Sequence, residues 1–180
     1  MILTGYARPA GAPDAAVHSA SMATKPDVTV AAIVARDDRF LLVEERVARR
    51  VVLNQPAGHL EAGETLAQAV VREALEETAW CFTPQALTGI YLWTNPVNRR
   101  SFLRVAFSGD VSDFSAERKL DRGILRTLWL TREELAQNEP RHRSPLVLRC
   151  IDDFLAGRRF PLDRVASLST AELGQQASVV

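Results

Sequence analysis

The sequence predicts a single layered domain of the α/β or α+β class. The chain has 180 residues, a length that fits one domain and allows two only if both are small. Apolar residues make up 47% of the chain, which is enough to bury a core. Short apolar runs occur together with segments of helical pattern, and this mixture indicates helices layered on a sheet.

Six short apolar runs predict the strands. The first is almost wholly apolar, which is typical of a strand buried on both faces. A turn at Asp37 and Asp38 leads from the first run to the second. The third leads into the loop 54–59, and a polar, turn-rich loop at 94–100 separates the fourth from the fifth. The runs cover residues 28–34, 40–43, 51–53, 87–93, 102–107 and 125–130.

Capping signals predict three helices. Thr65 and Gln68 form a capping box that opens a helix over 65–79, in which no Pro or Gly occurs. Thr131 with Glu134 opens a second, short helix in the same way. A third begins with Ser144 as N-cap and Pro145 at the first helical position, and it should end near Gly157.

The two ends of the chain differ from the middle. Residues 1–26 are rich in Ala, Pro, Ser and Gly without periodicity, and they predict a flexible N-terminal tail. We therefore expect the domain to cover 27–157 and the patternless residues 158–180 to form a C-terminal tail.

Charge and cysteine content exclude several classes of protein. With 22 Lys+Arg against 22 Asp+Glu the net charge is zero, which argues against a nucleic-acid partner or an acidic membrane surface. No run of apolar residues is long enough for a membrane-spanning helix. Cys81 and Cys150 lie far apart with no metal-site spacing, so we expect reduced core thiols and a cytoplasmic protein.

The pattern that predicts chemistry is Gly58-x5-Glu64-x7-Arg72-Glu73-x2-Glu76-Glu77. Six fixed positions at this spacing would arise by chance about once in 10⁵ chains of this length. At 100° per residue the last three carboxylates fall within one arc, at the edge of the apolar face of the helix. Their mutual repulsion would be reversed by a hard divalent cation such as Mg²⁺, which takes oxygen ligands.

The alternative is that these carboxylates form an ordinary solvated face, as most charge runs do. The chain enters the helix through Pro56, Ala57 and Gly58, a loop whose backbone can approach an ion closely. Together with the fixed Gly58 and Glu64, this loop favours the metal interpretation.

These residues resemble the Nudix box, G-x5-E-x7-R-E-U-x-E-E-x-G-U, which binds Mg²⁺ in hydrolases of diphosphates linked to another moiety. The one departure is Ala79 at the position of the late glycine, which concerns the helix end more than the metal. The stretch 53–61 and the later Arg143-Ser144-Pro145-Leu146-Val147 resemble the phosphatase-type subgroup, which acts on thiamine-pathway pyrophosphates and nucleoside di- and triphosphates. The resemblance covers about residues 24–156.

The resemblance implies an α/β/α sandwich around a mixed central sheet, and it implies a role for each box residue. Glu73 and Glu77 would be metal ligands, with Glu76 a further ligand or the base that deprotonates water. The backbone carbonyl of Ala57 would be another ligand. Arg72 and Glu64 would form a supporting ion pair that orients the carboxylates. The cofactor would be Mg²⁺, with Mn²⁺ as an alternative, in a monomer or homodimer that acts on a small phosphorylated substrate.

Several other residues are candidates for substrate binding. Arg99 and Arg100, with Arg104 beyond them, have the planar donors that suit phosphate, although ordinary solvated arginines are an equal alternative. Arg46 belongs to a similar cluster. Trp93 could stack on a substrate ring, as could Phe102, although aromatic residues in strands more often belong to the core.

Two questions stay open at the level of sequence. Glu117 or Asp121 could supply an extra carboxylate to the metals and compete with Glu76 as the general base. The leading function is hydrolysis of small ring-bearing phosphoanhydrides with release of orthophosphate. The alternatives are an ADP-ribose or other nucleoside-diphosphate-linked pyrophosphatase, with which Pro96 is compatible, and a non-catalytic nucleotide-sensing domain.

Overall fold

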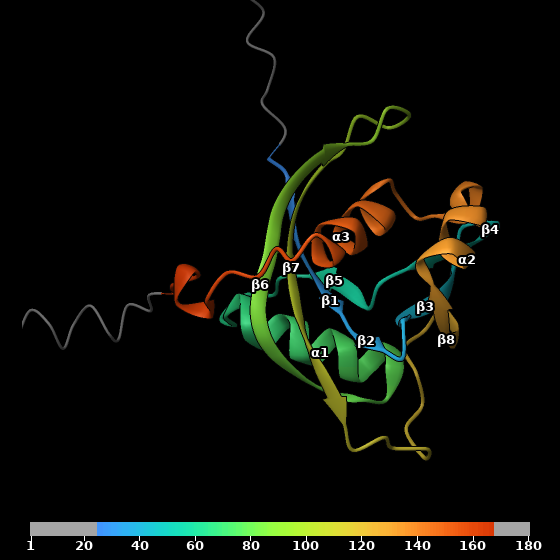
Figure 1. The fold of residues 1–180 in the computed structure, drawn as a ribbon. Coiled ribbons are helices and arrows are strands. Elements are labelled where there is room, and N and C mark those ends of the chain that lie inside the picture. The colour runs from blue at the N-terminus through green and yellow to red at the C-terminus, as the bar shows by residue number, and fades with distance from the viewer. Residues whose placement is uncertain (1–24, 168–180) are drawn as a thin grey trace, which may run out of the picture.

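The computed structural model describes residues 25–167, and Figure 1 shows their arrangement. Most of the expected N-terminal tail and the last residues of the expected C-terminal tail lie outside the described residues. The strands are β1 (Asp27–Ile33), β2 (Ala35–Arg36), β3 (Arg39–Val47), β4 (Arg50–Asn54), β5 (Ala57–His59), β6 (Cys81–Thr94), β7 (Ser101–Ser112) and β8 (Ile124–Thr131). The helices are α1 (Leu66–Thr78), α2 (Arg132–Gln137) and α3 (Leu146–Leu155), with short 3-10 turns at Glu139–Arg141 and Leu162–Arg164.

The strands form two sheets. The first has the order β5-β1-β7-β6, in which β1 and β7 run parallel and the other pairs antiparallel. The second has the order β2-β3-β4, with β8 paired to β3. The first sheet is therefore mixed, as expected, and it carries the residues discussed below.

Strand β1 separates two cores because its side chains alternate between the two faces of the sheet. Val30 and Ala32 pack with α1, whereas Ala31 and Ile33 pack with α3, and all four are at most 1% exposed. Helices α1 and α3 thus cover opposite faces of the sheet (Figure 1). This confirms the α/β/α sandwich and the prediction that the first strand is buried on both faces.

Both predicted capping boxes are present, at Thr65 with Gln68 and at Thr131 with Glu134. Helix α3 is assigned from Leu146, one residue later than expected. Pro145, which has helical dihedrals, stands at the N-cap in place of the predicted Ser144 and makes no side-chain capping hydrogen bond. The Ser144 hydroxyl oxygen still accepts the Leu146 N–H at 3.3 Å, next to the predicted position.

One feature of α1 differs from the prediction. Helical periodicity places the carboxylates at the edge of the apolar face and Ala67 within it. The buried residues of α1 include Glu73 and Glu77 beside Val70 and Ala74, whereas Ala67 is exposed. The apolar face is therefore rotated toward the carboxylates, and two of them lie within it.

The chain beyond the expected domain end remains packed. Phe160 forms an isolated bridge with Leu87 on the edge strand β6. Leu162 and Val165 pack against the core on the α1 side of the sheet. The boundary at residue 157 remains a prediction, but the described residues after it cover part of the sheet. None of the helices within 25–167 has the length and apolarity to span a bilayer.

The end of α1 explains how Ala79 replaces the glycine of the box. Ala79 has φ 60° and ψ 14°, and its N–H donates to the carbonyl of Leu75 at 3.0 Å. This left-handed conformation closes the helix in the way that glycine would, at a steric cost of about 1–2 kcal/mol for a residue with a Cβ. Alanine is small enough to be held there.

The left-handed conformation of Ala79 predicts that glycine is tolerated at this position and that a β-branched residue is not. Ala79→Gly should change the free energy of unfolding by less than about 1 kcal/mol, since relief of strain offsets the lost methyl burial and added chain entropy. Ala79→Val should cost at least about 2 kcal/mol, because a β-branched residue is strained at positive φ. Urea unfolding would measure both. Ala67→Val, on the same helix but exposed and helical, is the control and should cost only a few tenths of a kcal/mol.

Candidate active site

Strand β5 and helix α1 bring the two buried carboxylates together with the loop glycine. A Cβ on Gly58 would lie 2.0 Å from Glu73 Oε1, so only glycine leaves room for this carboxylate. The N–H of Ala57 donates to Glu77 Oε2 at 2.8 Å. The fixed glycine of the motif is therefore explained by close packing of the loop on the helix.

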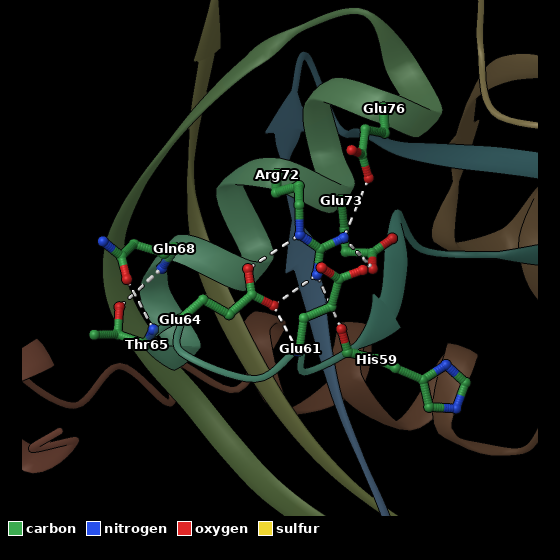
Figure 2. A network of polar contacts seen from close by, with 8 residues as sticks. All are labelled: His59, Glu61, Glu64, Thr65, Gln68, Arg72, Glu73 and Glu76. Atoms are coloured by element: carbon green, nitrogen blue, oxygen red, sulfur yellow. Dashed lines mark hydrogen bonds and ion pairs between the residues drawn. The ribbon is translucent and has the colours of Figure 1, made fainter. Parts of the chain in front are cut away.

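Arg72 joins the loop to the helix through a network shown in Figure 2. Its Nε and Nη2 donate to the two oxygens of Glu64 at 3.0 and 2.7 Å, the paired geometry that planar guanidinium favours. Glu64 Oε1 also accepts the backbone N–H of Glu61 at 2.7 Å, and Arg72 Nη2 donates to the His59 carbonyl at 3.0 Å. The ion pair expected between Arg72 and Glu64 is present.

The same guanidinium also reaches the carboxylates of the helix. Arg72 Nη1 donates to Glu73 Oε1 at 2.8 Å and to Glu76 Oε2 at 3.1 Å (Figure 2). Arg72 therefore holds Glu64, Glu73 and Glu76 in fixed relative positions. Its position between them offsets the repulsion that three neighbouring carboxylates would otherwise experience.

Burial and neighbouring charges shift the pKa values of Glu64, Glu73 and Glu77 differently. The hydrogen bonds from Arg72 hold the pKa of Glu64 below its ordinary value. Burial raises the pKa of Glu73, although Arg72 opposes the shift. Burial raises the pKa of Glu77 to about 8, and the nearby charges of Glu73 and Glu45 add to the shift. Glu77 is therefore the carboxyl group whose ionised form would be stabilised most by a nearby positive charge.

The buried carboxylates open onto a cleft of about 630 Å³ on the α3 side of the first sheet. Glu73, Glu77 and Gly58 line one part of it, and Trp93 and Phe102 line another. The two aromatic rings stack with centroids 5.9 Å apart. Carboxylates and aromatic rings therefore meet in one cavity, a combination suited to a charged ligand that bears a ring.

The structure divides the predicted site residues into three groups. Within the cleft lie Glu73, Glu77, Ala57, Trp93 and Arg100. Glu64, Arg72 and Glu76 belong to the supporting network and do not line the cleft. Arg46 and Arg99 are exposed and lie outside the cleft.

Arg100 is only partly available to a ligand. Its Nη2 is paired with Asp27 at 2.7 Å, and its guanidinium lies 5.6 Å from the centre of the Phe102 ring. Asp27 and Phe102 are neighbours across β1 and β7, so this arrangement is built into the sheet. Arg100 closes one wall of the cleft beside the aromatic pair.

Sequence reasoning missed several residues of the cleft. Glu45 lines it, and its Oε1 is buried without a hydrogen-bond partner among the described residues. Arg104, named only as a member of an arginine cluster, is 7% exposed and lines the cleft. Further polar lining residues are Thr29, Asn54, His142 and Arg143. The only sequence signal was the polar residues within apolar strands, which does not tell which face each occupies.

The donor set fits a hard divalent cation. Within residues 25–167 no three carboxylate, imidazole or thiolate groups already surround one point, since Arg72 draws Glu73 and Glu76 to itself. However, Glu73 and Glu77 are buried carboxylates, and Glu45 Oε1 accepts no hydrogen bond among the described residues, its one ion-pair contact being with Arg143 at 4.0 Å. Oxygen ligands of this kind suit Mg²⁺ and Mn²⁺. The ligand roles of Glu73, Glu77, Glu76 and the Ala57 carbonyl stay predictions.

The candidates for an extra carboxylate lie near the helix but outside the cleft. The N–H of Asp121 donates to the carbonyl of Glu76 at 2.9 Å, and the charge of Asp121 contributes to the raised pKa values of Glu73 and Glu77. Glu117 is exposed in the same segment. Both side chains are outside the cleft lining, so the choice of base among Glu76, Asp121 and Glu117 stays open.

The sandwich and the loop–helix site together define a Nudix hydrolase, an enzyme that acts on phosphoanhydrides. The NUDIX domain model matches residues 25–149, and the chain belongs to this family. Phosphatase NudJ of Escherichia coli strain K12 is 37% identical over 145 residues, covering 81% of this chain and 94% of the relative. Enzymes of this family generally use divalent metals such as Mg²⁺.

Solved structures agree with the family assignment. A NUDIX hydrolase from Nitrosomonas europaea is 50% identical, with a TM-score of 0.78 over 80% of this chain and 98% of that one. An ADP-ribose pyrophosphatase from Streptococcus suis is 17% identical, with a TM-score of 0.55 over 74% of this chain and 93% of its own. At that identity the second likeness concerns the fold alone.

The helix carboxylates lead to a prediction about activity. Glu73→Gln, Glu76→Gln and Glu77→Gln should each lower kcat by at least about 10²-fold, because each removes charge that would stabilise the transition state through a bound cation. Initial rates of phosphate release would measure this. Glu61→Gln is the control, since its exposed side chain makes no hydrogen bond to any described residue and only its backbone joins the network. Near-normal activity in all three variants would refute the metal assignment.

The raised pKa of Glu77 leads to a prediction about stability. In chelator, the folded chain keeps this proton up to about pH 8, whereas an unfolded chain loses it near the ordinary value of 4.5. The folded state therefore binds more protons in this window, and the contribution of Glu77 to stability falls as pH rises. Glu77→Gln should match the parent near pH 4.5 and exceed it at pH 8 in urea unfolding. A parent that gains on the variant as pH rises would contradict the assignment.

Proposed function

We propose that this Nudix hydrolase cleaves phosphoanhydride bonds of small, flat, ring-bearing substrates, with Mg²⁺ as cofactor, and releases orthophosphate. Thiamine pyrophosphate, its pyrimidine pyrophosphate precursor, and nucleoside di- and triphosphates belong to this class. One observation carries the proposal: the cleft joins the carboxylates Glu73 and Glu77 to the stacked rings of Trp93 and Phe102. The first pair suits the metal and anhydride, and the second suits a planar ring.

The residues of the cleft divide the work between binding and chemistry. Glu73, Glu77 and the Ala57 carbonyl would hold the metal, and Arg72 with Glu64 would keep the carboxylates oriented. A bound divalent metal would polarise the phosphoryl oxygens and lower the pKa of water. Glu76, Asp121 or Glu117 would take the proton from that water. Trp93 would stack on the substrate ring, with Arg100 at the wall of the same pocket.

The comparison with Phosphatase NudJ supports orthophosphate as the product, since that relative is described as a phosphatase and its whole length is nearly covered. Stacking on an aromatic ring tolerates several rings, so we expect broad selection among bases. Arg46 and Arg99, which lie outside the cleft, would contact only a substrate that extends beyond it. We further expect a cytoplasmic protein that acts as a monomer or homodimer.

The released product tests this proposal. With Mg²⁺ and a nucleoside triphosphate, phosphorus NMR should show orthophosphate and a diphosphate intermediate that is then consumed. Chelator should abolish both signals. Direct formation of monophosphate and pyrophosphate would contradict the phosphatase proposal and leave the family unchanged. ADP-ribose should be a poor substrate in the same assay, and its preferential cleavage would favour a nucleoside-diphosphate-linked pyrophosphatase instead.

A further inference from the structure

Arg104 is a buried cation that forms no ion pair with any carboxylate of the described residues. It lies near the start of β7, is 7% exposed, and faces the cleft. Its two side-chain hydrogen bonds go to the neutral amide oxygens of Asn54 and Gln55, each at 3.3 Å, and its Nε has no partner. Within residues 25–167 it forms no ion pair, although a buried charge is costly unless it is paired.

The surroundings of Arg104 fix its position without neutralising it. The Gln55 side chain is 1% exposed and donates to the Val147 carbonyl at 2.6 Å, which orients its oxygen toward Arg104. The nearby thiol of Cys150 is buried, and burial raises its pKa to about 11, so it stays neutral near pH 7. These contacts position the guanidinium without a carboxylate in contact with it, and the charge of Glu45, which also lines the cleft, acts on it only from a distance.

A second unpaired donor lies beside it. Thr29 of β1 is the direct neighbour of Arg104 across the parallel strand pair. Thr29 is 7% exposed and lines the cleft, and its hydroxyl has no hydrogen-bond partner among the described residues. A threonine hydroxyl can donate to an anion as readily as to a carbonyl. Arg104 Nε and the Thr29 hydroxyl are therefore two adjacent, buried donors that lack an acceptor among the described residues.

The strand register places these donors between the two ends of the cleft. On the same face of the sheet, Ala31 beside Ala57 lies two residues along β1 from Thr29. In the other direction Phe102 lies two residues along β7 from Arg104. Two residues of strand span about 6.6 Å. Along the strands, the donors therefore lie about this distance from the row that contains Ala57 and from the row that contains Phe102.

We propose that Arg104 and Thr29 form the seat for a phosphate group of the substrate, between the carboxylate end and the aromatic end of the cleft. This rests on the proposed function, because it assigns recognition of the phosphates to residues of that same cleft. The planar donors of arginine suit phosphate oxygens, and the hydroxyl adds a directional contact. Phosphate recognition is thereby carried by a buried residue rather than by the exposed arginines of the hairpin loop.

The seat is tested by measuring the binding of inorganic pyrophosphate by calorimetry. Chelator is present, so that metal-dependent catalysis does not occur. Arg104→Met should weaken this binding by about 10- to 100-fold, the range for loss of a hydrogen bond to a charged group. KM for a nucleoside triphosphate should rise by a similar factor with a smaller effect on kcat. Arg132→Met removes the same charge at an exposed ion pair with Asp152, away from the cleft, and should leave binding unchanged.

A purely structural role predicts a different result. If Arg104 only held Asn54 and Gln55 in place, Arg104→Met would lower the melting temperature and leave pyrophosphate affinity unchanged in the folded fraction. The proposal predicts an unchanged or higher melting temperature without ligand, since an unpaired buried charge is removed. Unchanged pyrophosphate affinity would overturn it.

Thr29→Val tests the seat if Arg104→Met does not fold, since it removes only the unpaired hydroxyl. Weaker pyrophosphate binding by this variant supports the seat, and equal binding overturns it. The outcome is separable from that of the proposed function. Release of pyrophosphate from a triphosphate would contradict the phosphatase proposal, whereas loss of affinity in Arg104→Met would still support the seat.

Discussion

The structure depends on burying two carboxylates in the face of α1 that packs on the sheet. Buried carboxylates are costly unless hydrogen-bonded or paired. Here Arg72 donates to Glu73, and the Ala57 N–H donates to Glu77. Gly58 follows from the same constraint, since any Cβ would overlap the Glu73 carboxylate. The spacing of the box therefore expresses one physical requirement, close packing of a loop against a charged helix face, rather than a set of independent choices.

Strand register decides what the carboxylates face. The parallel pairing of β1 with β7 and the antiparallel pairing of β7 with β6 arrange the cleft in rows across one face of the sheet. Arg104 shares a row with Thr29, and Phe102 shares the next with Trp93. A shift of one residue in β7 would turn both Arg104 and Phe102 to the α1 side. The pairing of a few strands thus sets the composition of the site as much as the box does.

The sequence was informative where structure is local and uninformative where it depends on pairing. Capping residues and helical period predicted α1, because those contacts lie within a few residues of one another. The Arg72–Glu64 pair was implied by the resemblance to the Nudix box. The rest of the cleft required the register. The sequence predicts Arg46 as a substrate-binding candidate and gives no signal for Glu45, yet neighbours in a strand face opposite sides, and Glu45 is the one that lines the cleft. Likewise Arg104 has the same local signal as exposed Arg99, and only the pairing of β7 distinguishes them.

Acidic and basic side chains both line the cleft, and the sheet holds them apart. Glu45 and Glu77 are acidic and Arg104 is basic, and no ion pair joins Arg104 to either. Had these charges paired with one another, a phosphoanhydride with its cation would have to break that pair before binding. Kept apart by the sheet, they would be available to the opposite charges of the proposed substrate and its cation. Under the proposed function, interactions that would have stabilised the folded chain would instead serve substrate and metal, so this part of the fold would favour binding over stability.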